Sequence, residues 1–244
     1  MEGGLGGSAA SRGYGELFAQ QSLKDVFVNR IDLAQEPGSH HLNVFRVNTV
    51  KNLGGKNGDV VADGECWKSP NWSDWPIVAN SQLSSPGQNV VDWKLPDGVA
   101  HKFKAHELLM VQSHYVNATT QTTPGKGHAQ INFYTEDASK VTAELGTVFT
   151  TNQNIKACPG DVDKSYSATC KFAKSTPVTI VGANGHFHSR GTRFTIAPWD
   201  STNGAGAIFY DNKSWNEPLF ELSENIAVPV NGGVQYTCEY SVPS

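Results

Sequence analysis

The chain has 244 residues, a net charge of −4 and a pI of about 6.0. No basic run or stripe occurs, so a nucleic-acid partner is not expected, and no apolar run is long enough to span a bilayer. Only 17% of the residues are charged, whereas Gly is frequent and Asn, Ser and Thr are abundant. This composition predicts many short strands joined by turns, in one large or two modest β domains.

The chain order suggests a leader followed by two domains. Residues 1–15 are rich in Gly, Ser and Ala and are expected to form a flexible leader. The polar stretch 150–156 is typical of a link between domains. Residues 16–150 and 151–244 are therefore expected to form the two domains.

Strands are expected where short apolar or β-branched runs alternate with polar residues or are bounded by turn residues. These runs are 25–28, 42–47, 107–116, 130–134, 141–149, 167–172, 178–181, 192–196, 207–210 and 233–240. No long window has a 3.6-residue apolar period, so helix content should be low. We predict an all-β fold of two consecutive antiparallel, jelly-roll-like β-sandwiches.

Two adjacent histidines, His40 and His41, follow the Pro37-Gly38 turn and precede the alternating strand 42–47. Adjacent residues face opposite sides of a regular strand. They can share a metal ion only where a strand begins or bulges, and the turn supplies such a beginning. The alternative is a chance dipeptide.

Along the expected strand 107–116, Leu108, Met110, Gln112 and His114 share one face. A buried His or Gln needs hydrogen-bond partners. His114 is therefore either a satisfied core histidine or a metal ligand.

The stretch Gly185-His186-Phe187-His188 has apolar, β-branched flanks and is expected to lie in a strand. His186 and His188 would then point the same way and could share one metal ion. Copper and zinc suit imidazole best among common metals. The alternative is a pair of surface histidines that alternate by chance.

The four cysteines, Cys66, Cys158, Cys170 and Cys238, form no Cys-x-x-Cys pair, which excludes a zinc ribbon. Scattered cysteines in a β-rich chain fit disulfides in an oxidising compartment, so we expect a secreted, extracellular or periplasmic protein. The alternative is free buried thiols in a cytosolic protein. The Pro159-Gly160 turn between Cys158 and Cys170 favours a local disulfide between these two.

Four motifs, taken in order, resemble the copper type II, ascorbate-dependent monooxygenases, the family of the peptidylglycine α-hydroxylating and dopamine β-monooxygenases. The likeness runs from about Asp25 to the end of the chain. The motifs are Pro37-Gly38-Ser39-His40-His41, Gln112-Ser113-His114-Tyr115-Val116-Asn117, His186-Phe187-His188-Ser189-Arg190-Gly191 and Tyr236-Thr237-Cys238-Glu239-Tyr240.

The resemblance implies two β-sandwich domains and two separate copper sites. His40, His41 and His114 would hold the first copper, which relays electrons. His186 and His188 would hold the second, where oxygen binds and a substrate C–H bond is cut. The implied activity is hydroxylation of a small organic substrate with O2 and an external reductant such as ascorbate.

Gln112 matches a Gln often found in the family, but two other features depart from its pattern. The family's second copper takes a methionine from a later segment, whereas the methionines here are Met1 and Met110. Family partners of Cys170 and Cys238 also lie in that segment, so pairing of these two with later cysteines is the family alternative to the local disulfide. The second domain is therefore expected either to lack its C-terminal part, which these cysteines favour, or to hold its copper with two ligands or with another residue in place of the methionine.

The second departure concerns substrate. The peptide-amidating member has an Arg where this chain has Asn184, so a C-terminal glycine peptide is not the expected substrate.

A competing hypothesis is a non-catalytic copper-binding β-sandwich module within an extracellular assembly. A zinc hydrolase lacks support, because no acidic residue adjoins the histidine pairs.

Overall fold

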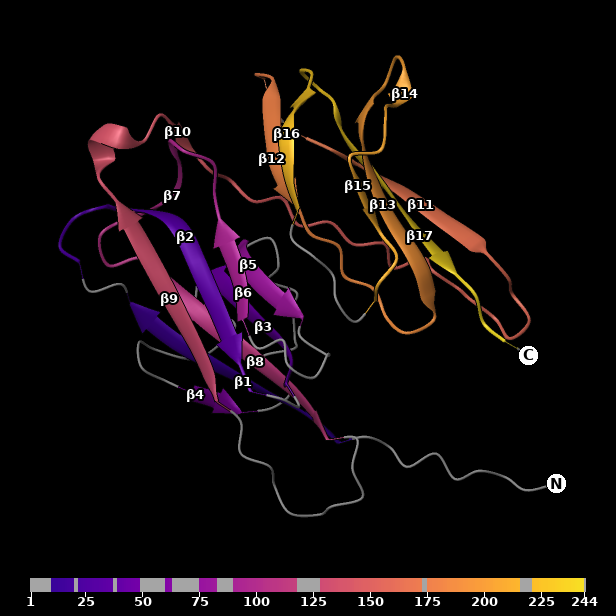
Figure 1. The fold of residues 1–244 in the computed structure, drawn as a ribbon, viewed down its shortest axis with the longest axis horizontal. Helices are drawn as coiled ribbons and strands as arrows, with labels where there is room; N and C mark the ends of the chain where they lie inside the picture. The colour runs from indigo at the N-terminus through magenta and orange to yellow at the C-terminus, as the bar shows by residue number, and fades with distance from the viewer. Residues whose placement is uncertain are drawn as a thin grey trace. The chain divides into compact units, whose positions relative to one another are not determined.

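The computed structural model describes residues 10–19, 22–36, 39–48, 60–62, 75–82, 90–117, 128–172, 175–215 and 221–243. For strand residues 10–19, 39–40, 60–62, 82, 116–117 and 221–224 it describes the backbone alone. These ranges contain strands β1 to β17 and one short 3₁₀ helix, η2 (Ala138–Lys140), so the predicted all-β class is confirmed (Figure 1). Clustering of contacts divides the chain into unit 1, residues 1–149, and unit 2, residues 150–244.

Unit 1 contains two five-stranded sheets. The first has the order β4-β1-β8-β3-β5; the second has the order β10-β7-β2-β6, with β9 also paired to β2. Their strands are β1 (Ala10–Ala19), β2 (Val26–Gln35), β3 (Ser39–Arg46), β4 (Val60–Ala62), β5 (Ile77–Gln82), β6 (Val90–Lys94), β7 (Val99–Phe103), β8 (Leu108–Asn117), β9 (Ala129–Glu136) and β10 (Ala143–Glu144). The β10–β7 pair is parallel, whereas the other pairs described in unit 1 are antiparallel.

Alternate residues of the two sheets form the core of unit 1. Ile31 and Leu33 of β2 and Leu42 and Val44 of β3 are fully buried in one hydrophobic cluster. Since side chains alternate along a strand, the residues that alternate with Leu42 and Val44 face away from this core. His41 and Asn43 therefore lie on the opposite face of the first sheet.

Unit 2 contains a five-stranded sheet, β11-β17-β13-β14 with β15 also paired to β13, and a two-stranded sheet of β12 and β16. Its strands are β11 (Lys164–Lys171), β12 (Val178–Ala183), β13 (Gly191–Asp200), β14 (Gly204–Ala205), β15 (Tyr210–Asn212), β16 (Glu221–Val228) and β17 (Gly233–Tyr240). All these pairs are antiparallel. A mainly aromatic cluster lies at its core, with the buried members Phe187, Phe194, Tyr210, Tyr236 and Cys238.

Two expected segments need correction. The expected leader, residues 1–15, overlaps β1, whose first residue Ala10 pairs with Asn117 of β8. Pairing with β8 on one side and β4 on the other supplies the hydrogen bonds that compensate for the low β propensity of its glycines. In the expected strand 141–149, regular pairing is confined to Ala143–Glu144.

The predicted Cys158–Cys170 disulfide is wrong, because Cys158, Cys170 and Cys238 are free thiols in the structure. The Cys158 turn is fixed to Val242 by two backbone hydrogen bonds and precedes the Lys164 end of β11. At about 3.3 Å per residue, β11 carries Cys170 about 20 Å beyond Lys164. Cys66 lies outside the described residues. The local disulfide therefore gives no support to the expected oxidising compartment.

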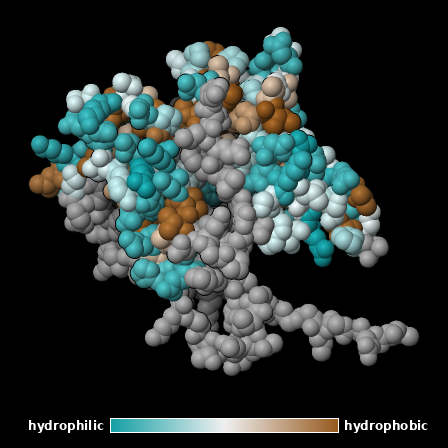
Figure 2. Space-filling view, in the orientation of Figure 1, coloured by the Kyte–Doolittle hydropathy of each residue, from teal (hydrophilic) through white to brown (hydrophobic). Residues whose placement is uncertain are grey.

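Exposed large hydrophobic side chains are dispersed over the chain. In the face shown in Figure 2, hydrophobic residues form small groups among hydrophilic ones. The exposed members are Leu23, Val90, Tyr134, Val148, Phe149, Val162, Ile208 and Val230. Among the described residues, no helix is long and apolar enough to cross a bilayer.

Candidate metal centres

In unit 1, strand pairing brings His41 and His114 together. The two residues stand directly opposite each other in the antiparallel β3–β8 pair. Their ring centroids are 4.7 Å apart and the rings meet edge to face at 78°. Each residue is half-buried, and the Nδ1 atom of each ring is buried from solvent. Two imidazoles far apart in sequence thus share one side of the first sheet.

The β3–β8 pairing shifts register between Ser39 and His41, so this part of the strand is irregular. A bulge inserts a residue and re-aims the neighbouring side chains. The expected condition for two adjacent histidines to serve one site is therefore present in the backbone. The His40 side chain lies outside the described residues, so its direction stays a prediction.

Polar and then apolar pairs continue along the same face from the His41–His114 pair. Asn43 opposes Gln112 in register and donates a hydrogen bond from Nδ2 to Gln112 Oε1 at 3.0 Å. Met110 follows, fully buried in a cluster with Trp75 and Val47. Since Gln112 is buried beside the histidines, its amide ties the two strands together next to the pair.

In unit 2, His186 and His188 also come together. Their Nε2 atoms are 3.2 Å apart and their ring centroids 5.0 Å apart, with the rings at 86°. Both side chains are exposed. The expected strand is absent: β12 ends at Ala183 and β13 begins at Gly191, so the pair lies in the irregular connection between them. The predicted alternation holds nevertheless, because Phe187 between them is buried.

Close packing fixes this His-Phe-His turn. Phe187 is 2% exposed and stacks on Phe194, with ring centroids 6.2 Å apart and planes at 13°. A Cβ on Gly191 would lie 2.4 Å from Phe187 Cδ2, and one on Gly185 would lie 2.4 Å from Phe194 Cδ1. Glycine is therefore required on both sides of the turn, since any side chain would displace a buried ring.

The separation of the two Nε2 atoms fits a shared metal ion. Metal–imidazole bonds are about 2.0–2.1 Å long, so two such bonds at a tetrahedral angle place the nitrogens roughly 3.3 Å apart. The observed 3.2 Å is close to that separation. A hydrogen bond between the rings fits the same distance, with one Nε2–H donating to the other nitrogen. Among the described residues, no group of three or more His, Cys, Asp or Glu side chains is placed to hold a metal.

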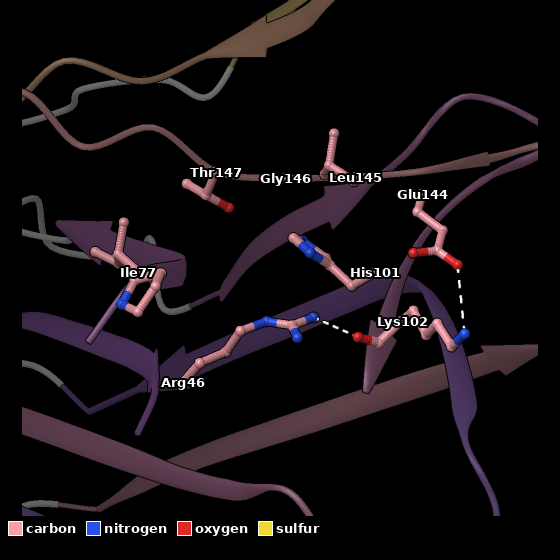
Figure 3. Close-up of a pocket in the computed structure, with 9 residues that line it drawn as sticks. Arg46, Ile77, His101, Lys102, Glu144, Leu145, Gly146 and Thr147 are labelled. Carbon is pink, nitrogen blue, oxygen red and sulfur yellow. Dashed lines mark hydrogen bonds and ion pairs between the residues drawn. The ribbon is translucent and has the colours of Figure 1, made fainter. Parts of the chain in front are cut away.

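Sequence reasoning overlooked a third polar feature, a cavity of about 290 Å³ in unit 1 beside His101 (Figure 3). His101 is 3% exposed. Burial, and secondarily the charge of Arg46, lowers its pKa from 6.5 to about 4. The Arg46 guanidinium donates to the Lys102 carbonyl oxygen and to Glu107 Oε1, at 2.6 and 2.8 Å. The alternation of Val99, His101 and Phe103 would have placed this ring on a buried face.

The comparisons with known proteins do not assign a family. No protein-family model matches the chain, and no curated protein matches it. The functional assignment therefore depends on the motifs and on the geometry of the two histidine pairs.

Proposed function

We propose that the chain is a copper-dependent monooxygenase that hydroxylates a C–H bond of a small organic substrate, using O2 and an external reductant such as ascorbate. The observation that carries this proposal is the pairing of imidazoles in both units. His41 meets His114 across two strands, and His186 meets His188 across one turn. The motif order that resembles the copper monooxygenases supports the choice of copper.

In unit 1, His41 and His114 would hold one copper ion together with His40. The strand pair and the Asn43–Gln112 hydrogen bond would keep His41 and His114 in place as the charge of the site changes. A site that changes little between two oxidation states suits electron transfer, because little reorganisation accompanies each step. Unit 1 would therefore supply electrons.

In unit 2, His186 and His188 would hold the second copper ion. When bound, copper supplies the redox chemistry that activates O2. The chain's own contribution is to present two exposed imidazoles on a backbone fixed by the buried Phe187. With two described nitrogen donors, such a site leaves coordination positions open for small molecules.

The metal-binding part of this proposal is tested by copper titration of purified wild-type, His114→Ala and His188→Ala proteins. We expect up to two copper ions per wild-type chain and the loss of about one in each variant. His128→Ala is the matched control, because His128 is exposed and belongs to neither pair. Unchanged stoichiometry in both variants would contradict the site assignment.

The catalytic part is tested by oxygen consumption of the copper-loaded protein with ascorbate and a panel of C–H substrates. We expect His186→Ala to abolish substrate hydroxylation while His128→Ala retains it.

A second candidate, a non-catalytic copper-binding module, is favoured by one observation: unit 2 offers two imidazoles and no further described His, Cys, Asp or Glu ligand. Copper binding without hydroxylation of any substrate in the panel would favour the module.

A further inference from the structure

Tyr210 lies next to the His-Phe-His turn and is buried, with 1% of its surface exposed. Its hydroxyl oxygen accepts a hydrogen bond at 3.0 Å from the backbone N–H of Gly185, the residue before His186. Its ring meets Phe194 edge to face, with centroids 6.1 Å apart, and Phe194 stacks on Phe187. Tyr210 therefore reaches the turn through both its hydroxyl and its ring.

The Tyr210 hydroxyl is itself held in place by a neighbouring amide. Asn212 donates from Nδ2 to the Tyr210 oxygen at 3.2 Å, and its Oδ1 accepts from the Ser214 N–H at 2.6 Å. Asn212 is buried. A hydroxyl oxygen has two lone pairs, and here they receive the Gly185 N–H and the Asn212 amide. These two hydrogen bonds fix the position of the Tyr210 hydroxyl oxygen.

The other end of the turn is tied down by backbone hydrogen bonds. The Gly191 N–H donates to the His188 carbonyl oxygen at 2.7 Å, and the Ser241 N–H donates to the Arg190 carbonyl oxygen at 3.0 Å. His188 is thus fixed by the following backbone, whereas the backbone before His186 is fixed by Tyr210. The distance between the two imidazoles depends on both attachments.

We propose that Tyr210 is a positioning residue for the unit 2 metal centre, acting through the Gly185 N–H to set the place of His186 relative to His188. This inference rests on the proposed function of that histidine pair. Removal of the hydroxyl leaves a buried N–H without its acceptor, which is costly. Movement of the Gly185 backbone relieves that cost and carries His186 away from His188.

The test compares Tyr210→Phe with Tyr236→Phe. Tyr236 is a matched control, because it is buried in the same aromatic cluster and its hydroxyl donates to the Thr151 carbonyl oxygen at 2.8 Å rather than to the turn. Copper affinity is measured by chelator competition in a His114→Ala background, which isolates the unit 2 site. We expect Tyr210→Phe to weaken copper binding about tenfold or more, and Tyr236→Phe to change it less than threefold. Equal weakening by the two variants would overturn the positioning role.

A second readout needs no metal. In metal-free protein, a nuclear Overhauser contact between the rings of His186 and His188 is expected in wild type and Tyr236→Phe, and is expected to be lost in Tyr210→Phe. Its retention in Tyr210→Phe would overturn the inference. If wild type bound no copper, the proposed function would fail, and the inter-ring contact would still decide whether Tyr210 positions His186.

Asn212→Ala covers the case in which Tyr210→Phe does not fold. It leaves the tyrosine in place and removes the amide that holds its hydroxyl. We expect copper binding about threefold weaker and a weaker inter-ring contact. An Asn212→Ala protein with wild-type affinity and an unchanged contact would count against the proposal.

Discussion

The two histidine pairs differ in how the fold brings their members together. His41 and His114 come from two strands far apart in sequence and meet because β3 and β8 pair in register. His186 and His188 come from one irregular stretch and meet because the intervening Phe187 is buried. The first pair is half-buried on a sheet face, whereas the second is exposed.

This difference separates two ways of holding ligands. A pair across strands depends on backbone register, which many ladder hydrogen bonds determine together. A pair within one turn depends on a few packing contacts, here the stack of Phe187 on Phe194. We therefore expect the unit 2 pair to respond strongly to single substitutions in the core, and the unit 1 pair to respond to changes in cross-strand partners.

The largest expected effect is that of Phe187→Ala. Loss of a buried aromatic side chain costs about 3–5 kcal/mol of unfolding free energy, and the turn loses the side chain that orients its two histidines. For the proposed copper sites, calorimetry and copper titration should show a destabilised unit 2 that no longer binds copper at His186 and His188, while binding at the unit 1 site is retained. Val162→Ala is the control, since Val162 is 73% exposed in the same unit. Intact unit 2 copper binding in a folded Phe187→Ala protein would show that the buried Phe187 does not hold the two histidines together.

The next effect concerns a buried histidine that belongs to neither pair. The pKa of His101 falls from 6.5 to about 4 in the folded protein, so between these values the unfolded chain binds a proton that the folded chain does not. Stability should therefore fall as pH drops from 6.5 to 4, by roughly 3 kcal/mol from this residue. Above pH 6.5 this contribution is constant.

Urea unfolding at pH 7 and pH 4.5 measures this contribution. We expect His101→Gln to lose less stability on acidification than wild type, because the group that takes up a proton on unfolding is gone. His106→Gln, which alters an exposed histidine of the same unit, is the matched control. An identical loss in wild type and His101→Gln would show that burial of His101 does not set the acid sensitivity of unit 1.

A smaller effect is expected beside the unit 1 pair, at the Asn43–Gln112 hydrogen bond. Gln112→Leu removes the acceptor from Asn43 and should cost about 1–3 kcal/mol. Asn43→Leu combined with Gln112→Leu should recover part of that cost, because Asn43 is then no longer a polar side chain without its hydrogen-bond acceptor. Denaturant unfolding and copper affinity of the three variants measure the coupling. Purely additive losses would mean that this hydrogen bond does not couple the strands.

The sequence was sufficient for the features that local periodicity controls. The alternation along residues 42–47 predicted a strand, and the spacing of His186 and His188 put both on one side of the chain. The strand expected around His186 was wrong because the glycines at 185 and 191 admit the buried rings of Phe194 and Phe187, and the chain turns there instead of continuing a ladder.

Features that depend on pairing between distant segments were less accessible. No local feature of β3 or β8 predicts that His41 stands opposite His114. The resemblance assigned both residues to one site, and the strand register places them side by side. The cavity beside His101 was overlooked because the segment near Glu144 that lines it pairs in parallel with β7 from a distance in the chain. The cysteine prediction failed for the same reason, since strand direction rather than sequence distance separates Cys158 from Cys170.

The smallest effect on stability is expected from reducing agents. The three described cysteines all belong to unit 2 and are free thiols, so dithiothreitol should shift the melting temperature of this unit by less than about 1 °C, whereas loss of a native disulfide would lower it much more. Reaction with a thiol reagent measures directly which cysteines are free. Cys158 is exposed and should react first. Burial raises the pKa of Cys170, and raises that of Cys238 to about 11, so both should react more slowly, because the thiolate is the reactive form. Cys158→Ser should remove the fast phase alone. If Cys158 and Cys170 instead became reactive together, only after reduction, the local disulfide would exist, and with it the argument for an oxidising compartment would return.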